Sequence, residues 1–240
     1  MSVADPAGAR AILAAARAAG RSALNEVEAK QVLAAFGIAV PPGALLPPEP
    51  AGPLAEGLHG PFALKIVSRD ILHKTEAGGV RIGLPDAAAA GAAIAEMGAR
   101  IAASGHAVDG WLLEEMAPKG VEMVVGALHD PRFGPVVMCG FGGVLVELLG
   151  DIAFAICPID AVDCDAMLET LRGRALLSGW RGAPPAAIGA LRAALLAIGG
   201  PGGLLEAVGD AVAELDINPL IVSPAGAVAA DARIILGDAR

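Results

Sequence analysis

The sequence predicts an α+β fold with two lobes, and three observations lead to it. Apolar segments typical of strands alternate along the chain with segments typical of helices, and Pro- and Gly-rich stretches separate them. At 240 residues, the chain is long enough for one large domain or for two lobes that share a cleft. It is 55% hydrophobic but only 3% aromatic, so aliphatic side chains must fill the core.

The N-terminal segment predicts two helices. Residues 1–21 are alanine-rich and are expected to form an amphipathic helical extension. Asn25, with Glu28 three residues later, is the pattern of a capping box that begins a second helix. Gly37 is expected to end that helix, and Pro41–Pro42 prevents its continuation.

The rest of the chain predicts strands, three further helices and a terminal hairpin. We expect strands at 61–67, 80–84, 110–116, 121–127 and 135–139, and helices at 86–104, 161–172 and 184–198. The chain is therefore divided into an N-terminal extension at 1–21, a first lobe at 22–114 and a second lobe at 115–240.

The composition excludes several classes of function. A net charge of −9 and a pI near 4.9 argue against a nucleic-acid partner. No apolar run reaches the ~18 residues of a membrane span, so no membrane association is expected. Cys139, Cys157 and Cys164 form no CxxC pattern, which predicts buried, reduced thiols in a cytoplasmic protein.

A polar loop between two predicted strands carries residues typical of phosphate chemistry. Lys65 lies in an apolar strand, where a lysine is costly unless it points into a polar cleft. His73, Lys74 and the pair Gly78–Gly79 follow it. Lysines and glycine amides suit phosphate oxygens, and a histidine can carry a phosphoryl group as a covalent adduct. The alternative is an ordinary surface loop with a solvated histidine.

The terminal hairpin presents a second set of oxygen atoms. If its turn is centred on Pro224–Ala225, Asn218 lies opposite Asp231 and Asp216 lies opposite Arg233. Alternation places these four side chains on one face of the hairpin. Mg²⁺ takes one or two protein oxygens and completes its shell with water and nucleotide phosphates. The alternative is a solvated polar face with an Asp216–Arg233 ion pair.

Two of these segments together resemble a known family. KIVSRDILHKTEAGGV at 65–80 and ELDINPL at 214–220, with ADAR at 230–233, look like the ATP-grasp domain of the NDP-forming acyl-CoA synthetases. These are the ADP-forming acetate–CoA ligases, relatives of succinyl-CoA synthetase. DPRFGPVVM at 130–138 and GFGGVLVELLGD at 140–151 also match the family style. The resemblance implies an ATP-grasp fold whose two α/β lobes enclose a nucleotide cleft.

The resemblance assigns a role to each residue that matches these motifs. His73 would receive a phosphoryl group and pass it to ADP, while Lys65 would contact the nucleotide phosphates. Lys74 and the backbone of Gly78 and Gly79 would steady the loop around the histidine.

The resemblance also assigns an adenine site, a ribose contact and a metal site. Since adjacent strand residues point in opposite directions, we expect only one of Glu114 and Glu115 to face the nucleotide. The implied residues are Glu114, Glu115 and Met116 beside the adenine, Glu122 at the ribose or a phosphate-bound ion, and Asn218 and Asp231 as Mg²⁺ ligands.

The implied activity is that of an acid–thiol ligase, with ATP or ADP and Mg²⁺ as cofactors. The CoA-binding and ligase domains of the fused enzymes are missing, so a CoA-binding alpha-type subunit is expected as partner, in a heterotetramer. Ala155 stands where the family often has arginine, which would weaken a partner or phosphate contact. The alternatives are another ATP-grasp ligase that uses an acyl phosphate, and a non-catalytic nucleotide-binding subunit.

Overall fold

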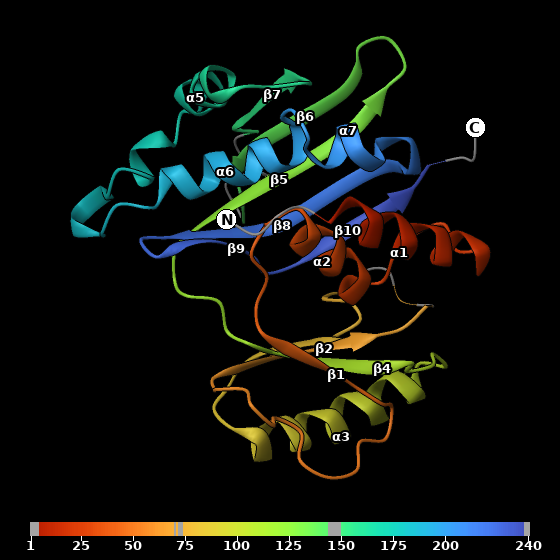
Figure 1. The fold of residues 1–240 in the computed structure, drawn as a ribbon. Coiled ribbons are helices and arrows are strands. Elements are labelled where there is room, and N and C mark those ends of the chain that lie inside the picture. Colours follow the sequence, from red (N-terminus) through yellow and green to blue (C-terminus); the bar gives the residue numbers. More distant parts are fainter. Residues whose placement is uncertain (1–4, 70, 72–73, 144–149, 238–240) are drawn as a thin grey trace. The chain divides into compact units, whose positions relative to one another are not determined.

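The chain forms two compact units, each with its own sheet and hydrophobic core (Figure 1). The computed structural model describes residues 5–69, 71, 74–143 and 150–237. The larger unit comprises Met1–Val40 with Pro118–Arg240, and the smaller unit comprises Pro41–Ala117. His73 lies outside the described residues.

The elements alternate along the chain as an α+β fold requires. The smaller unit contains β1 (Gly43–Leu46), β2 (Phe62–Val67), β3 (Val80–Leu84), α3 (Ala87–Ala103) and β4 (Gly110–Glu115). The larger unit contains α1 (Pro6–Ala18), α2 (Glu26–Ala35), β5 (Val121–Asp130), β6 (Gly134–Phe141), β7 (Ile152–Ile156), α5 (Ala161–Thr170), α6 (Ile188–Gly199), α7 (Leu204–Val208), β8 (Val212–Ser223), β9 (Gly226–Ala229) and β10 (Ala232–Leu236). Three short 3₁₀ helices, η1 (Arg174–Leu176), η2 (Trp180–Gly182) and η3 (Gly209–Ala211), also belong to it.

The smaller unit is a four-stranded antiparallel sheet, in the order β1-β4-β2-β3, with α3 on one face (Figure 1). Asp86 caps α3, because its Oδ1 accepts a hydrogen bond from the amide of Ala89 at 2.8 Å. The buried side chains of Met97 and Trp111 help to join the helix to the strands. The expected helix at 86–104 and strands at 61–67 and 80–84 are therefore confirmed.

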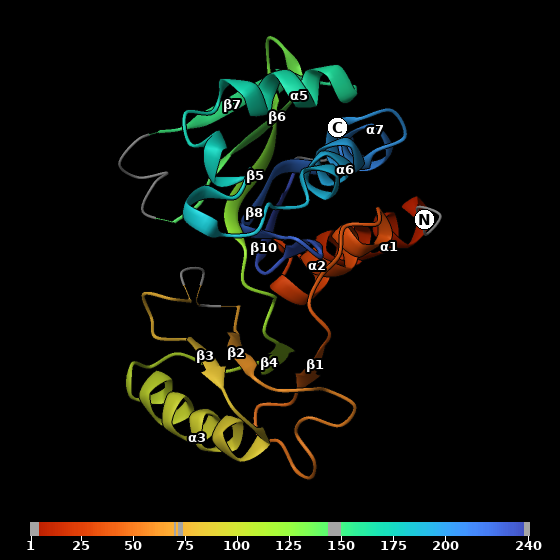
Figure 2. The same ribbon diagram turned by 90° about the vertical axis from the view of Figure 1, so that its left-hand side faces the viewer.

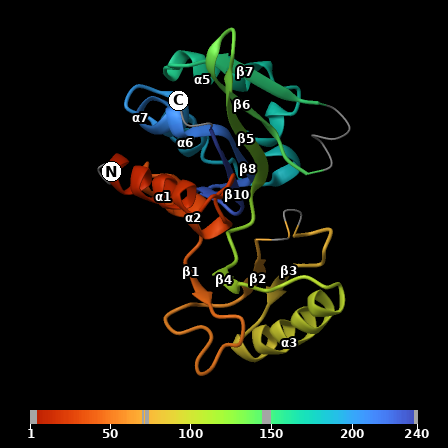
Figure 3. The ribbon, with the colours of Figure 1, turned by 90° about the vertical axis from the view of Figure 1, so that its right-hand side faces the viewer.

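The larger unit is a six-stranded antiparallel sheet, in the order β10-β8-β5-β6-β7, with β9 paired to β8. The helices α1, α2, α6 and α7 lie along one face of this sheet (Figure 2, Figure 3). Their buried residues and those of α5 form one core with inward residues of the central strands. Along β8, Leu215 and Ile217 are buried in that core, whereas Asp216 and Asn218 lie on the opposite face. The other face of the sheet is outside this core, and there Asp216 lies near the exposed apolar side chains of Leu128 and Phe154.

The N-terminal helices belong to the larger unit, which corrects the expected division of the chain. The segment that leads into α2 joins β10 through bonds from the Leu24 amide to the Ile234 carbonyl (3.0 Å) and from the Leu236 amide to the Ser22 carbonyl (2.8 Å). Leu13 of α1 is also buried in the larger core. Residues 1–21 are thus no separate extension, and the smaller unit begins at residue 41 rather than at 22.

The segment Ile188–Ala211 is long and apolar enough to cross a membrane by length and composition. Half of its most apolar window is buried inside the structure. The segment comprises α6, α7 and η3, and Gly200–Gly203 separate α6 from α7.

The three cysteines are free, as the sequence predicts. Burial raises the pKa of the Cys139 thiol to about 12 and the pKa of Cys157 and Cys164 to about 11. These thiols are therefore protonated at neutral pH, and a thiol is a poor nucleophile.

The capping box at the start of α2 is confirmed and includes an ion pair. The Glu28 carboxylate accepts a hydrogen bond from the backbone amide of Asn25 at 2.9 Å. It also accepts one from each terminal guanidinium nitrogen of Arg21, both at 2.7 Å. Burial acts to raise the pKa of Glu28, but the hydrogen bonds from Arg21 and Asn25 outweigh it and the pKa lies below its ordinary value. Ionised Glu28 thus stabilises the folded state.

We expect Glu28→Gln to lower the free energy of unfolding by about 1 kcal/mol at pH 7, since the charge opposite Arg21 is lost. Because the folded pKa lies below the unfolded value of about 4.3, this contribution is present above that pH and is lost as the pH falls through the folded pKa. Urea unfolding of both proteins at pH 7 and below pH 4 measures it. Glu56→Gln, at an exposed glutamate, should change neither value, and a difference that is independent of pH would contradict the assignment.

Candidate functional site

Lys65 and Glu114 form a buried ion pair on one face of the smaller sheet. Lys65 Nζ lies 3.1 Å from Glu114 Oε2, and the two side chains are only 8% and 3% exposed. Lys65 alternates with Leu64 and Ile66, which belong to the core beneath α3, so it points to the opposite face of the sheet. Because β2 and β4 are neighbours, residues almost fifty positions apart in sequence meet here.

The pair changes the interpretation of both residues. A carboxylate next to a buried lysine offsets part of the cost of burying the lysine's charge, and the Lys65 ammonium group lies 3.1 Å from the Glu114 carboxylate. Glu114 was expected beside the adenine, but its carboxylate lies against Lys65. The sequence missed this contact, since it contains no signal for which strand lies next to β2.

Glu115 points away from Glu114, as expected for adjacent strand residues. Its carboxylate accepts from the backbone amide of His59 at 2.8 Å, and His59 Nδ1 lies 3.2 Å from the same oxygen. The amide of Met116 donates to the Pro61 carbonyl at 2.9 Å. This amide is thus already used, and an adenine contact at Met116 would have to come from its other atoms.

The glycines of the 74–80 loop close the loop on itself. The Gly78 amide donates to the Thr75 carbonyl at 3.0 Å, and the Gly79 amide donates to the Lys74 carbonyl at 2.6 Å. A side chain on Gly79 would collide with Ile66. Both amides are therefore used within the loop in this structure, which agrees with a role in steadying it, and the predicted contact of Gly78 and Gly79 with phosphate stays a prediction.

The terminal hairpin of the larger unit has the predicted register. Val222 pairs with Ala227, and Asp216 pairs with Arg233. Between these pairs, the Asn218 amide donates to the Asp231 carbonyl at 3.3 Å, which confirms that these two residues face each other. The Asp231 Oδ1 atom also accepts from the Ala232 amide at 2.8 Å, which fixes the orientation of that carboxylate.

Three charged side chains, Glu214, Asp216 and Arg233, lie close to one another on this hairpin. Arg233 binds Glu214 at 2.6 Å, so the structure replaces the expected Asp216–Arg233 ion pair with a different one. The pKa of Asp216 is raised, chiefly by burial; Arg233 opposes this, and the negative charges of Glu214 and Asp231 add to it.

The donor set fits a hard divalent cation. Asn218 and Asp231 supply an amide and a carboxylate oxygen, which are the ligand types that Mg²⁺ binds. Among the described residues, no three His, Cys, Asp or Glu side chains gather as a metal cluster. Such a cluster is not required, because Mg²⁺ at a nucleotide takes only one or two protein ligands.

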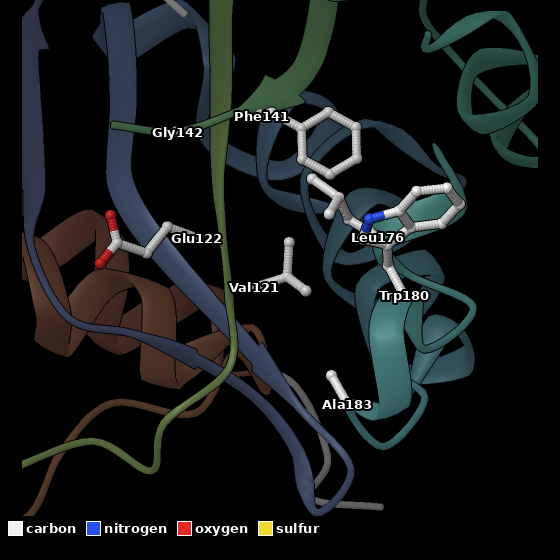
Figure 4. A pocket seen from close by; sticks show the side chains of 7 residues that line it. All are labelled: Val121, Glu122, Phe141, Gly142, Leu176, Trp180 and Ala183. Carbon is white, nitrogen blue, oxygen red and sulfur yellow. The ribbon is translucent and has the colours of Figure 1, made fainter. Parts of the chain in front are cut away.

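A pocket of about 290 Å³ lies beside the first residues of β5 (Figure 4). Val121 points toward Leu176 and Trp180, whereas the Glu122 carboxylate points to the other side of the strand (Figure 4). The carbonyl of Glu122 accepts from the Gly142 amide at 2.7 Å, which fixes the start of the glycine-rich segment. The predicted contact of Glu122 with a ribose or an ion stays a prediction.

Ala155 lies on the core side of the larger sheet. It pairs with Val137 in β6 and packs against the hydrophobic core. It is therefore on the face opposite Asp216 and Asn218.

The comparison with protein families gives the decisive observation. The model of the ATP-grasp domain matches residues 15–236 of this chain. The chain belongs to the ATP-grasp family. The mixed helices and sheets described above are the fold of that family, as the sequence predicts.

Relatives of this ATP-grasp chain are similar over nearly its full length. The beta subunit of the ADP-forming acetate–CoA ligase I of Pyrococcus furiosus is 36% identical over 96% of this chain and 98% of its own. The dinucleotide-forming acetyl-coenzyme A synthetase 1 of Ca. Korarchaeum cryptofilum, solved with coenzyme A, Ca-AMPCP and HgCl⁺, has a TM-score of 0.88 at 36% identity, covering 95% and 100% of the two chains.

A second structure of the Korarchaeum enzyme contains coenzyme A and Mg-AMPPCP, with its phosphohistidine segment pointing towards the nucleotide-binding site. It has a TM-score of 0.80 at 35% identity, again over 95% and 100% of the two chains.

For the buried pair, we expect Lys65→Met and Glu114→Leu each to lower the free energy of unfolding by about 3 kcal/mol, because each removes one charge of the buried ion pair. The double variant Lys65→Met/Glu114→Leu should recover most of that loss. Urea unfolding of the four proteins measures the coupling. Additive losses would show that the two side chains do not stabilise each other.

Proposed function

We propose that this ATP-grasp chain is the nucleotide-binding subunit of an NDP-forming acyl-CoA synthetase. The reaction is acyl-CoA + ADP + phosphate ⇌ carboxylic acid + CoA + ATP. The observation that supports it most is the similarity to the beta subunit of an acetate–CoA ligase, because the aligned region covers 98% of that subunit and 96% of this chain. In this proposal the chain transfers a phosphoryl group between His73 and ADP, and the acyl chemistry takes place on a partner subunit.

Two groups of residues have separate tasks in this proposal. Lys65, which lies 3.1 Å from the Glu114 carboxylate, attracts the nucleotide phosphates. Asn218 and Asp231 hold Mg²⁺, which when bound neutralises phosphate charge. The chemistry then depends on positioning and charge neutralisation rather than on a protein nucleophile other than His73.

The partner in this proposal is a CoA-binding alpha-type subunit, and the assembly is a heterotetramer. The beta-subunit relative implies by its name that another subunit exists. The free, protonated thiols fit a reducing compartment, and we place the protein in the cytoplasm.

The role of His73 is tested with labelled phosphate. We expect wild-type chain, mixed with its companion subunit, labelled ATP and Mg²⁺, to acquire an acid-labile label, and His73→Ala to lose it with at least a 100-fold fall in turnover. His106→Ala is the matched control, since His106 is an exposed histidine without a phosphate motif around it.

The outcomes separate three functions. Unchanged turnover in His73→Ala would indicate a ligase that uses an acyl phosphate directly. Nucleotide binding without any label or turnover in the wild type would indicate a non-catalytic nucleotide-binding subunit. Either result would refute the phosphohistidine proposal.

The metal role of the hairpin is tested by Asp231→Asn. Asn keeps an oxygen that can accept from the Ala232 amide, so the turn is preserved while the charge is lost. We expect the Mg²⁺ concentration for half-maximal nucleotide binding to rise about 10-fold, one ligand's charge being worth roughly 1.4 kcal/mol. Isothermal titration calorimetry at several Mg²⁺ concentrations measures it. Asp210→Asn, at an exposed aspartate of the same unit, should leave the requirement unchanged, and an equal requirement in Asp231→Asn would exclude that ligand.

A further inference from the structure

The segment 171–187, between α5 and α6, is a cationic surface on an acidic protein. It contains Arg172, Arg174 and Arg181 and no Asp or Glu, whereas the whole chain has a net charge of −9. All three arginines are exposed. We call this segment the arginine loop.

The arginine loop is held firmly to the end of the larger sheet. The buried carboxylate of Asp151 accepts from the amides of Arg172 and Gly173, each at 2.8 Å. At the other end, the Ala187 amide donates to the Ser223 carbonyl at 3.0 Å. A loop fixed at both ends loses little entropy when a partner binds.

An exposed tryptophan lies beside the apolar pocket in this loop. Trp180 is 54% exposed and lines the 290 Å³ pocket together with Val121, Glu122, Phe141, Gly142, Leu176 and Ala183 (Figure 4). The indole lies beside Leu176, and the Glu122 carboxylate points away from both (Figure 4). Among the described residues that line the pocket, none is cationic and Glu122 is acidic, so the pocket suits an aliphatic or aromatic side chain better than a phosphate-bearing ligand.

The residue after the tryptophan has a strained backbone. Arg181 has φ 52° and ψ 38°, and it is the one non-glycine residue with positive φ in the described part of the chain. Gly179 and Gly182, with φ of 91° and 84°, flank it. A glycine would adopt this conformation at lower cost, and strained residues of this kind gather at binding sites.

We propose that the arginine loop is the docking surface for the CoA-binding companion subunit. This inference rests on the proposed function. An apolar side chain of the companion occupies the Trp180 pocket, and a carboxylate beside it pairs with Arg181. Trp and Arg are the residue types that contribute most binding energy at protein interfaces, and the charge of the loop selects an acidic segment.

The test measures binding of the purified companion subunit to the full-length chain by biolayer interferometry. We expect Trp180→Ala to weaken binding at least 30-fold and Arg181→Gly about 10-fold. Arg181→Gly relieves the backbone strain, so its melting temperature should equal or exceed that of the wild type. Phe133→Ala is the matched control, since Phe133 is 61% exposed at the β5–β6 turn, and it should change binding less than 3-fold.

The outcomes distinguish this inference from the proposed function. Binding of Trp180→Ala and Arg181→Gly with wild-type affinity would overturn the docking surface and leave the proposed function intact. Self-association of the wild-type chain that is lost in Trp180→Ala would instead assign the surface to a second copy. Failure of the wild type to bind the companion would overturn both the inference and the proposed partner, while calorimetry with Mg·ATP would still report on the nucleotide site.

Discussion

The alternation of side chains along β8 is the constraint on which the larger unit depends. This strand pairs with β5, β9 and β10, and its inward residues Leu215 and Ile217 are fully buried beneath the helices. A slip of one residue would bury Asp216 and Asn218 in that core, at a cost of several kcal/mol for each buried polar group without partners. The hydrophobic face therefore fixes the polar face, and the polar face is where the candidate metal ligands lie.

How much of the site could be predicted depends on how local each contact is. The pairing of Asn218 with Asp231 follows from one short turn and the two-residue period of strands, so the sequence was sufficient. The pairing of Lys65 with Glu114 requires knowing that β4 lies next to β2, which no local pattern encodes. The same limit explains why Arg233 was assigned to the residue directly opposite rather than to Glu214, its diagonal neighbour.

In the fold as well, features set by neighbouring residues could be predicted from the sequence, whereas contacts between distant residues could not. The capping residues Asn25, Asp86 and Asp160 each begin a helix through hydrogen bonds within three residues, and such signals are readable in a sequence. The position of α1 and α2 depends on bonds to β10, some 200 residues later. The attachment of the arginine loop likewise depends on a distant residue, since the amides of Arg172 and Gly173 donate to the carboxylate of Asp151.

The contact between the N-terminal helices and β10 has a consequence for how this protein is made. Residues 41–117 form a continuous stretch of chain, and their sheet and helix are complete as soon as that stretch leaves the ribosome. The larger core needs residues from both ends of the chain, so it closes only after β10 has been synthesised. Until β10 has been synthesised, the apolar faces of α1 and α2 have no complete core to pack against. The protein is therefore most prone to aggregation during that interval.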